Sequence, residues 1–112
     1  MKFYVAARWN QKEQVMEIYD KIRKEGHEIT EDWTEHTYVK PYDENPTPSR
    51  NLSSLDIKGV ENSDVFILLS DAAGVGMYVE FGAAIMHKLL RGNPEIYVIG
   101  DNLGRSMFFF HP

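Results

Sequence analysis

The chain has 112 residues, enough for one hydrophobic core and too few for two, so we expect a single domain over residues 1–112. A formal net charge of -5 argues against polymeric DNA or RNA as a partner, because proteins that bind it usually carry a basic field. The absence of cysteine excludes disulfides and thiolate metal sites. No apolar stretch has the length of a membrane span or a signal peptide, so we expect a cytoplasmic protein without a membrane partner.

The first half of the sequence alternates between strand-like and helix-like segments. Residues 3–7 are rich in strand formers, and the run has the length of a buried central strand. A helix is predicted next by apolar residues that recur at helical spacing up to Gly26: Val15, Ile18, Tyr19 and Ile22. Residues 27–30 are a second strand candidate. The polar, proline-punctuated residues 31–49 form a long loop, which in a compact domain is usually functional or mobile.

The second half repeats this alternation. A helical pattern starts at Pro48, and residues 64–70 form the clearest strand, because their apolar run is continuous, as in a parallel strand covered on both faces. A glycine loop at residues 71–76 leads into a helix candidate at residues 77–90, and residues 96–99 form a last strand. Strands that alternate with helices predict an open α/β sheet with right-handed crossovers. Ligands in such sheets bind at the carboxyl ends of the strands.

Glu80 is the only acidic residue of the helix candidate at residues 77–90, which has little polar face and should be largely buried. We expect Glu80 in the first turn, near the partial positive charge of the helix N-terminus. The backbone N–H groups around Gly74, Gly76 and Met77 are available there to a small ligand. A carboxylate in this position has the properties of an electrostatically supported nucleophile. The alternative is a glutamate that only offsets the helix dipole.

Two further residues are candidates for the same site. Asp56 falls four residues after Leu52 and four before Val60, which places it on or beside the apolar face of its helix. The phenol of Tyr4, on the first strand, is suited to hydrogen-bond a carboxylate across the top of the sheet. The alternative for Asp56 is an acidic residue at the edge of the apolar face of an amphipathic helix, without a role in a site. The alternative for Tyr4 is an ordinary strand tyrosine.

Other chemistries lack their motifs. The segment Gly74-Val75-Gly76 has no third glycine and follows a late strand, so it is not a dinucleotide fingerprint. No Gly-x-Ser-x-Gly elbow exists for a serine hydrolase. Four scattered histidines lack zinc-ligand spacing and are interpreted as structural or solvated: His27, His36, His87 and His111. We therefore expect no metal and no cofactor.

Residues 2–7, 55–64 and 74–84 together resemble the nucleoside 2-deoxyribosyltransferase family, which has related 2'-deoxynucleoside 5'-phosphate N-hydrolases. The resemblance implies a flavodoxin-like (Rossmann-like) open parallel sheet of about five strands with helices on both faces. It also implies that Glu80 is the nucleophile, that Asp56 assists at the base and that Tyr4 orients Glu80. The resemblance also implies a homodimer or larger assembly. The aromatic run at residues 108–110 independently favours one, because so much aromatic surface should be buried by a contact. The alternative is that this run packs within its own chain.

One position departs from the family pattern. Six residues before the glutamate, where family members often carry a polar residue, this chain has Gly74. Sugar or phosphate recognition would then come from backbone amides, from Asp71 or from Arg8, unless Arg8 is an ordinary surface arginine. Three aromatic residues of the long loop are candidates to stack on the base, with packing of the loop itself as the alternative: Trp33, Tyr38 and Tyr42.

The expected substrate is therefore a small nucleoside or nucleotide. Glu80 would form a covalent glycosyl ester with net retention, and Asp56, with its pKa raised by burial or by the Glu80 charge, would protonate the leaving base. The deoxyribosyl group would then pass to another base, as in nucleotide salvage. Hydrolysis of a 5'-monophosphate is the first alternative, and a non-catalytic nucleotide-binding module or an NAD-cleaving domain are the others.

Overall fold

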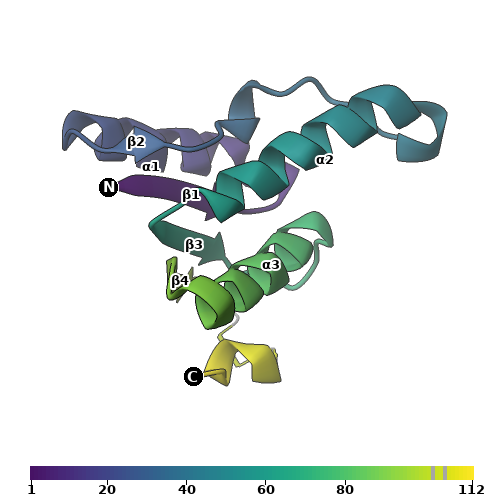
Figure 1. The fold of residues 1–112 in the computed structure, drawn as a ribbon. Coiled ribbons are helices and arrows are strands. Elements are labelled where there is room, and N and C mark those ends of the chain that lie inside the picture. Colours follow the sequence, from purple (N-terminus) through teal and green to yellow (C-terminus); the bar gives the residue numbers. More distant parts are fainter. Residues whose placement is uncertain (102, 105) are drawn as a thin grey trace.

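A computed structural model describes residues 1–101, 103, 104 and 106–112 and has a mixed α/β fold (Figure 1). Within the described residues, four parallel strands form one sheet in the order β2-β1-β3-β4. These strands are β1 (Lys2–Ala6), β2 (Glu28–Ile29), β3 (Val65–Leu69) and β4 (Glu95–Ile99). The α-helices between them are α1 (Lys12–Lys24), α2 (Pro46–Glu61) and α3 (Gly76–Arg91).

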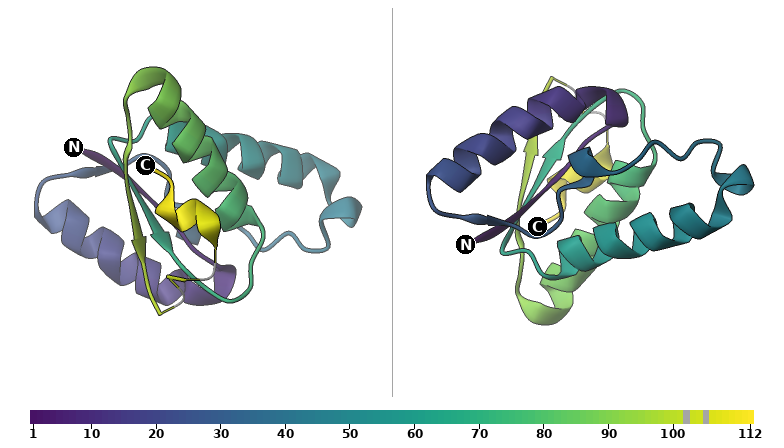
Figure 2. Two further views of the ribbon diagram at one scale, coloured as in Figure 1. Left: turned by 90° about the horizontal axis from the view of Figure 1, so that it is seen from below. Right: turned by 90° about the horizontal axis from the view of Figure 1, so that it is seen from above.

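The strand order determines which face of the sheet each helix covers. The connection from β1 to β2 crosses the sheet in one direction, and the two later connections cross it in the other. Because such crossovers are right-handed, α1 lies on one face while α2 and α3 lie on the other, as Figure 2 shows. The predicted open α/β sheet with helices on both faces is confirmed.

The resemblance implied about five strands, and the described residues contain four. After β4 the chain forms a short 3-10 helix instead, η4 (Met107–Phe110), whose start is capped by the hydroxyl of Ser106. Phe109 of η4 packs against Tyr78 and Phe81 of α3. Part of the aromatic run is therefore covered within the chain, while Phe108 and Phe110 stay exposed.

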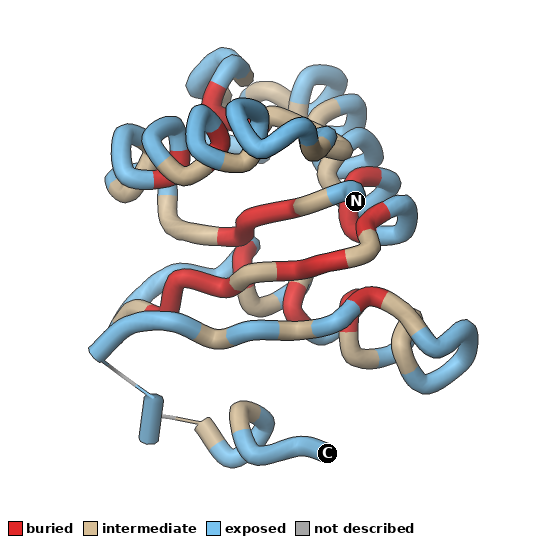
Figure 3. The backbone as a smooth tube through the Cα atoms, turned by 90° about the vertical axis from the view of Figure 1, so that its left-hand side faces the viewer, coloured by how far each residue is buried: buried red, intermediate tan, exposed pale blue. Residues whose placement is uncertain are grey.

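The core lies around the two central strands, which Figure 3 shows in red where they are buried. Four of the five residues of β3 are buried, which explains the continuous apolar run of this strand: Val65, Phe66, Leu68 and Leu69. β4 lies at the edge of the sheet and its residues alternate between exposed and partly buried. The parallel strand covered on both faces that the sequence predicted is therefore β3.

Two expectations for α3 are wrong. The helix begins at Gly76, so Glu80 is its fifth residue and lies just beyond the first turn. The helix is also not largely buried, because the sheet covers only one of its sides, where Met77, Phe81 and Ala84 pack. Val79 on the outer side is 61% exposed. Among the described residues, no helix combines the length and apolar character needed to span a bilayer.

Candidate active site

A cavity of about 1180 Å³ opens beside the carboxyl ends of β1 and β3, where the topology predicted a ligand site. Its walls come from the loop after β1, the long loop before α2, α2 itself and the start of α3. The cavity is lined by nine residues that the sequence predicted as candidates for a site: Arg8, Trp33, Tyr38, Tyr42, Asp56, Gly74, Gly76, Met77 and Glu80. Tyr4 and Asp71 join this group through a hydrogen bond to Glu80 and an ion pair with Arg8, respectively.

Glu80 lines the cavity, and the fully buried Tyr4 supports it through a hydrogen bond. Glu80 lies three residues after Met77, so its side chain leaves α3 beside the stripe that packs on the sheet. The hydroxyl of Tyr4 donates a short hydrogen bond to Oε2 of Glu80. The Tyr4 ring is fully buried and stacks on Phe66 at a centroid distance of 6.0 Å, which fixes the direction of the hydroxyl. One carboxylate oxygen is thus held, and Oε1 has no protein donor among the described contacts.

Burial shifts the pKa values of these groups upward. The pKa of Glu80 is raised to about 8, first by burial and then by the nearby Asp56 charge, while the Tyr4 hydrogen bond acts in the opposite direction. Burial also raises the pKa of Asp56 to about 6. The pKa of Tyr4 is raised well above its usual value, so it keeps its proton and acts as a donor. Two carboxyl groups with perturbed pKa values in one cavity are typical of acid–base chemistry.

His36 belongs to the site, although the sequence predicted only a structural or solvated histidine at this position. Its side chain is 11% exposed and lines the cavity. Nε2 lies 3.1 Å from Oε2 of Glu31, and Nδ1 lies 3.8 Å from Oδ1 of Asp56, which is buried and has no hydrogen-bond partner. His36 lowers the pKa of Asp56 and Glu31 raises it. No local spacing indicates this contact, because only the fold brings the long loop over α2.

The glycine loop is shaped around Arg8. Nη1 of Arg8 lies 3.3 Å from Oδ1 of Asp71, which also accepts a hydrogen bond from the backbone N–H of Ala73. That N–H, followed by Arg8, lowers the pKa of Asp71. Gly74 has φ +104°, and a Cβ there would lie 2.9 Å from Cγ of Arg8. The arginine side chain therefore fills the space that a polar side chain at position 74 would need.

Aromatic side chains form the opposite wall. The indole N–H of Trp33 donates to the carbonyl of Val5 at 2.7 Å, so this buried ring is a fixed wall. Trp9 lies three residues after the last residue of β1 and is 37% exposed. Its ring centroid lies 6.1 Å from that of Trp33 and 5.9 Å from that of Tyr38. No stacking role was predicted for Trp9, although its place just after a central strand was a usable signal. Tyr42 lines the cavity farther out and is exposed.

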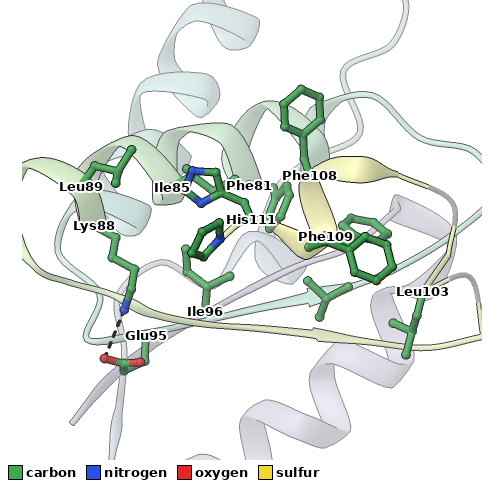
Figure 4. A pocket seen from close by; sticks show the side chains of 13 residues that line it. Phe81, Ile85, Lys88, Leu89, Glu95, Ile96, Leu103, Phe108, Phe109 and His111 are labelled. Carbon is green, nitrogen blue, oxygen red and sulfur yellow. Dashed lines mark ion pairs between the residues drawn. The ribbon is translucent and has the colours of Figure 1, made fainter.

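A second cavity of about 720 Å³ lies between α3, β4 and η4 (Figure 4). Apolar side chains dominate it, and its charged groups are the ion pair of Lys88 and Glu95, 3.2 Å apart, with His111 nearby. None of the site residues predicted from the sequence lines it. Among the described residues, no cluster of three or more potential ligands is arranged to hold a metal ion. The first cavity, with its paired carboxyl groups, is therefore the candidate active site.

Comparison with known proteins places the chain in a structural class. No protein-family model and no curated protein matches the sequence. The fold is similar to that of a solved structure, Clostridium botulinum CMP N-glycosidase, BcmB. The similarity has a TM-score of 0.57 at 17% identity and covers 94% of this chain and 78% of that chain. At this identity the similarity establishes the fold alone.

Proposed function

We propose that this protein cleaves the N-glycosidic bond of a nucleoside 5'-monophosphate, with Glu80 as a nucleophile that forms a glycosyl ester. The observation that carries the proposal is the pair of Glu80 and Asp56 in one cavity, with a hydrogen bond from buried Tyr4 to Glu80 and two raised carboxyl pKa values. The similarity in fold to a protein named a CMP N-glycosidase supports the same bond as the target.

The residues supply each step of a retaining reaction. Oε1 of ionised Glu80 attacks the anomeric carbon, the bond from that carbon to the base breaks, and its electron pair stays on the base. Asp56 donates a proton to the departing base. Its carboxylate then takes a proton from the water that hydrolyses the ester, which restores both groups. Tyr4 keeps Glu80 oriented throughout, because its hydrogen bond fixes Oε2.

The 5'-phosphate is assigned to the glycine loop. Arg8 is the cation that lines the cavity beside this loop, and its side chain is 36% exposed, so it can exchange Asp71 for a phosphate. Gly74 lines the cavity directly beside the Arg8 side chain, so this loop and the arginine border the same part of the cavity. Trp9 and Trp33 offer aromatic faces for the base, where stacking contributes about 1–3 kcal/mol.

The direct test is a screen of nucleosides and their 5'-monophosphates for released base by chromatography. Glu80→Ala and Glu80→Gln should abolish release while circular dichroism stays that of the wild type, because the covalent pathway is lost. Intact-mass spectrometry of the wild type during turnover should detect a glycosyl adduct that both variants lack. Turnover near the wild-type rate in a folded variant contradicts the nucleophile, and binding without any turnover indicates a nucleotide sensor.

Transfer to a second base is the other way to resolve the ester, and the sequence resemblance favours it. Hydrolysis is favoured because Arg8 is suited to bind a phosphate and because the fold is similar to that of a protein named a CMP N-glycosidase. Incubation with a deoxynucleoside or deoxynucleotide donor and an excess of a different base distinguishes the two. Free sugar or sugar phosphate without an exchanged product indicates a hydrolase, whereas a new nucleoside or nucleotide indicates a transferase.

A further inference from the structure

Tyr78 lies near the start of α3, next to the glycine loop. It is the third residue of the helix, whose first residue is Gly76. Side chains in a helix lean toward its N-terminus, so the Tyr78 ring points back toward the loop that precedes α3. Neither Tyr78 nor Asp71 is among the described residues that line the large cavity. An effect of Tyr78 on a bound ligand must therefore pass through other residues.

The hydroxyl of Tyr78 binds both polar groups of the Asp71 main chain. It donates a hydrogen bond to the carbonyl oxygen of Asp71 at 2.7 Å and accepts one from the backbone N–H of Asp71 at 3.4 Å. Asp71 is the first residue of the glycine loop, and Tyr78 follows seven residues later, in the helix after the loop. One phenol thus ties the start of the loop to the helix that the loop leads into.

The ring that carries this hydroxyl is itself held by aromatic contacts. Phe109 of η4 stacks on Tyr78 at a centroid distance of 6.3 Å and an interplanar angle of 27°. Phe109 also meets the ring of buried Phe81 edge to face at 5.6 Å. Figure 4 shows Phe81 and Phe109 beside the second cavity. The contacts connect Tyr78 to the core, so its hydroxyl has a defined position from which to hold Asp71.

The held main chain of Asp71 determines where its carboxylate meets Arg8. Oδ1 of Asp71 lies 3.3 Å from Nη1 of Arg8 and accepts the N–H of Ala73 at 2.9 Å. The side chains of Arg8 and Asp71 are 36% and 26% exposed, so an anion from solvent can reach this pair. The anion must compete with a carboxylate that is already in place. A phosphate dianion does so better than a singly charged group, because its attraction to the guanidinium is stronger.

We propose that Tyr78 is a positioning residue of the phosphate subsite, which fixes Asp71 so that Arg8 stays at the edge of the cavity until a phosphate dianion replaces the carboxylate. Asp71 is then an internal counter-anion that selects dianionic phosphates over singly charged anions. Because Tyr78 binds only the main chain of Asp71, the carboxylate can turn away while the start of the loop stays in place. The inference rests on the proposed function for the identity of the substrate.

The first experiment measures KM and kcat of base release for a nucleoside 5'-monophosphate and for the same nucleoside without phosphate. Tyr78→Phe keeps the ring that packs on Phe109 and removes the hydroxyl. It should raise KM for the monophosphate by about 3- to 10-fold, the range expected for one hydrogen bond, and leave kcat and the nucleoside kinetics unchanged. Tyr97→Phe is the matched control, because Tyr97 is exposed on β4 and does not line the cavity, and it should change neither.

Asp71→Asn should change KM in the opposite direction. Asparagine keeps an oxygen that can accept the N–H of Ala73, so the turn is retained, but it has no charge that competes for Arg8. KM for the monophosphate should fall by about 2- to 5-fold, as expected when a partly exposed ion pair no longer has to be broken. A purely structural defect would raise KM, so a decrease distinguishes the two roles.

The second experiment needs no turnover and measures the binding of inorganic phosphate by isothermal titration calorimetry at pH 8, where phosphate is mainly a dianion. The Kd should rise in Tyr78→Phe, fall in Asp71→Asn and keep its wild-type value in Tyr97→Phe.

Three results would overturn the inference: a wild type that does not bind phosphate, a Tyr78→Phe variant with wild-type KM and Kd, or an Asp71→Asn variant that does not bind phosphate more tightly. An equal loss for nucleoside and monophosphate in Tyr78→Phe would also overturn it, because that result indicates general support of the fold. Base release that continues in these cases leaves the proposed function intact. The expected pattern of phosphate binding in a protein that releases no base supports the inference and contradicts the proposed function.

Discussion

At neutral pH the carboxyl of Glu80 holds its proton more firmly than that of Asp56, because their pKa values are raised to about 8 and about 6. The proposed reaction needs the opposite arrangement, with Glu80 ionised and Asp56 protonated. Because the pKa of Glu80 is the higher of the two, the arrangement with Glu80 ionised and Asp56 protonated is the minor one before substrate binds. Hydrogen bonds that stabilise the Glu80 charge therefore increase the reactive fraction directly.

The first prediction concerns the pH profile of base release. A plot of kcat/KM against pH should be bell-shaped, with apparent pKa values near 6 and 8 that belong to the pair of carboxyl groups. Tyr4→Phe removes the hydrogen bond that lowers the pKa of Glu80, so the alkaline limb should move to higher pH and the maximum should fall. An unchanged alkaline limb in Tyr4→Phe would show that Tyr4 does not act on the nucleophile.

The second prediction concerns His36 as a positioning residue for Asp56. Because His36 lowers the pKa of Asp56, His36→Ala should move the acid limb of the profile to higher pH, and the alkaline limb should stay near 8. His87→Ala is the control, since His87 contacts the carbonyl of Asn93 and does not line the cavity. A uniform loss of activity at every pH would instead indicate that His36 only supports the loop.

The third prediction concerns stability. A carboxyl whose pKa is raised from 4.5 to about 8 on folding destabilises the folded state as pH rises between those values, because the unfolded chain ionises first. Glu80→Gln removes this effect, so urea unfolding should find the variant more stable than the wild type by on the order of 4 kcal/mol at pH 8 and nearly equal near pH 4. A constant difference across this range would contradict the raised pKa.

At the scale of elements, α2 approaches the sheet closely at Gly59, directly over Tyr4. A Cβ at this position would lie 2.8 Å from Cβ of Glu31 and 3.0 Å from the ring of Tyr4. Thr30 reinforces the contact, because its hydroxyl donates to the carbonyl of Gly59 at 2.7 Å. The close approach of one helix to one strand thus sets where the Tyr4 hydroxyl points.

The fourth prediction follows from this contact. Gly59→Ala should lower the free energy of unfolding by about 1–3 kcal/mol through overpacking, and it should reduce base release because the Tyr4 ring must shift. Ser54→Ala, on the exposed side of the same helix, should change stability by no more than about 0.5 kcal/mol. Wild-type stability and activity in Gly59→Ala would contradict the role of this contact.

The sequence predicted these elements well where hydrophobic periodicity decides them. The continuous run in β3 indicated a central strand, and the alternation of strands and helices indicated the sheet and its binding edge. Helix starts were less predictable: α2 begins at Pro46, two residues before the expected Pro48, because proline is well suited to the first helical position. A one-residue error at the start of α3 was enough to place Glu80 in the wrong turn.

At the scale of the whole molecule, the sequence indicated Glu80, Asp56 and Tyr4 but not how they meet. Their contacts depend on register and crossover geometry: Tyr4 pairs with Phe66 across β1 and β3, and α3 then brings Glu80 over them. His36 was missed for the same reason, since it reaches Asp56 from a loop. The exposure of the outer side of α3 was not predicted, because an apolar helix was expected to be buried by the rest of the chain.

The position of the tryptophans has a practical consequence. The chain has two, Trp9 and Trp33, and both line the cavity that holds Glu80. Trp33 is buried and hydrogen-bonded, whereas Trp9 is 37% exposed, so their emission should separate into a blue and a red component. A nucleobase that stacks on Trp9 would quench the red component first, and intrinsic fluorescence would report occupancy of the pocket in real time, without a label and even in a variant that cannot turn over.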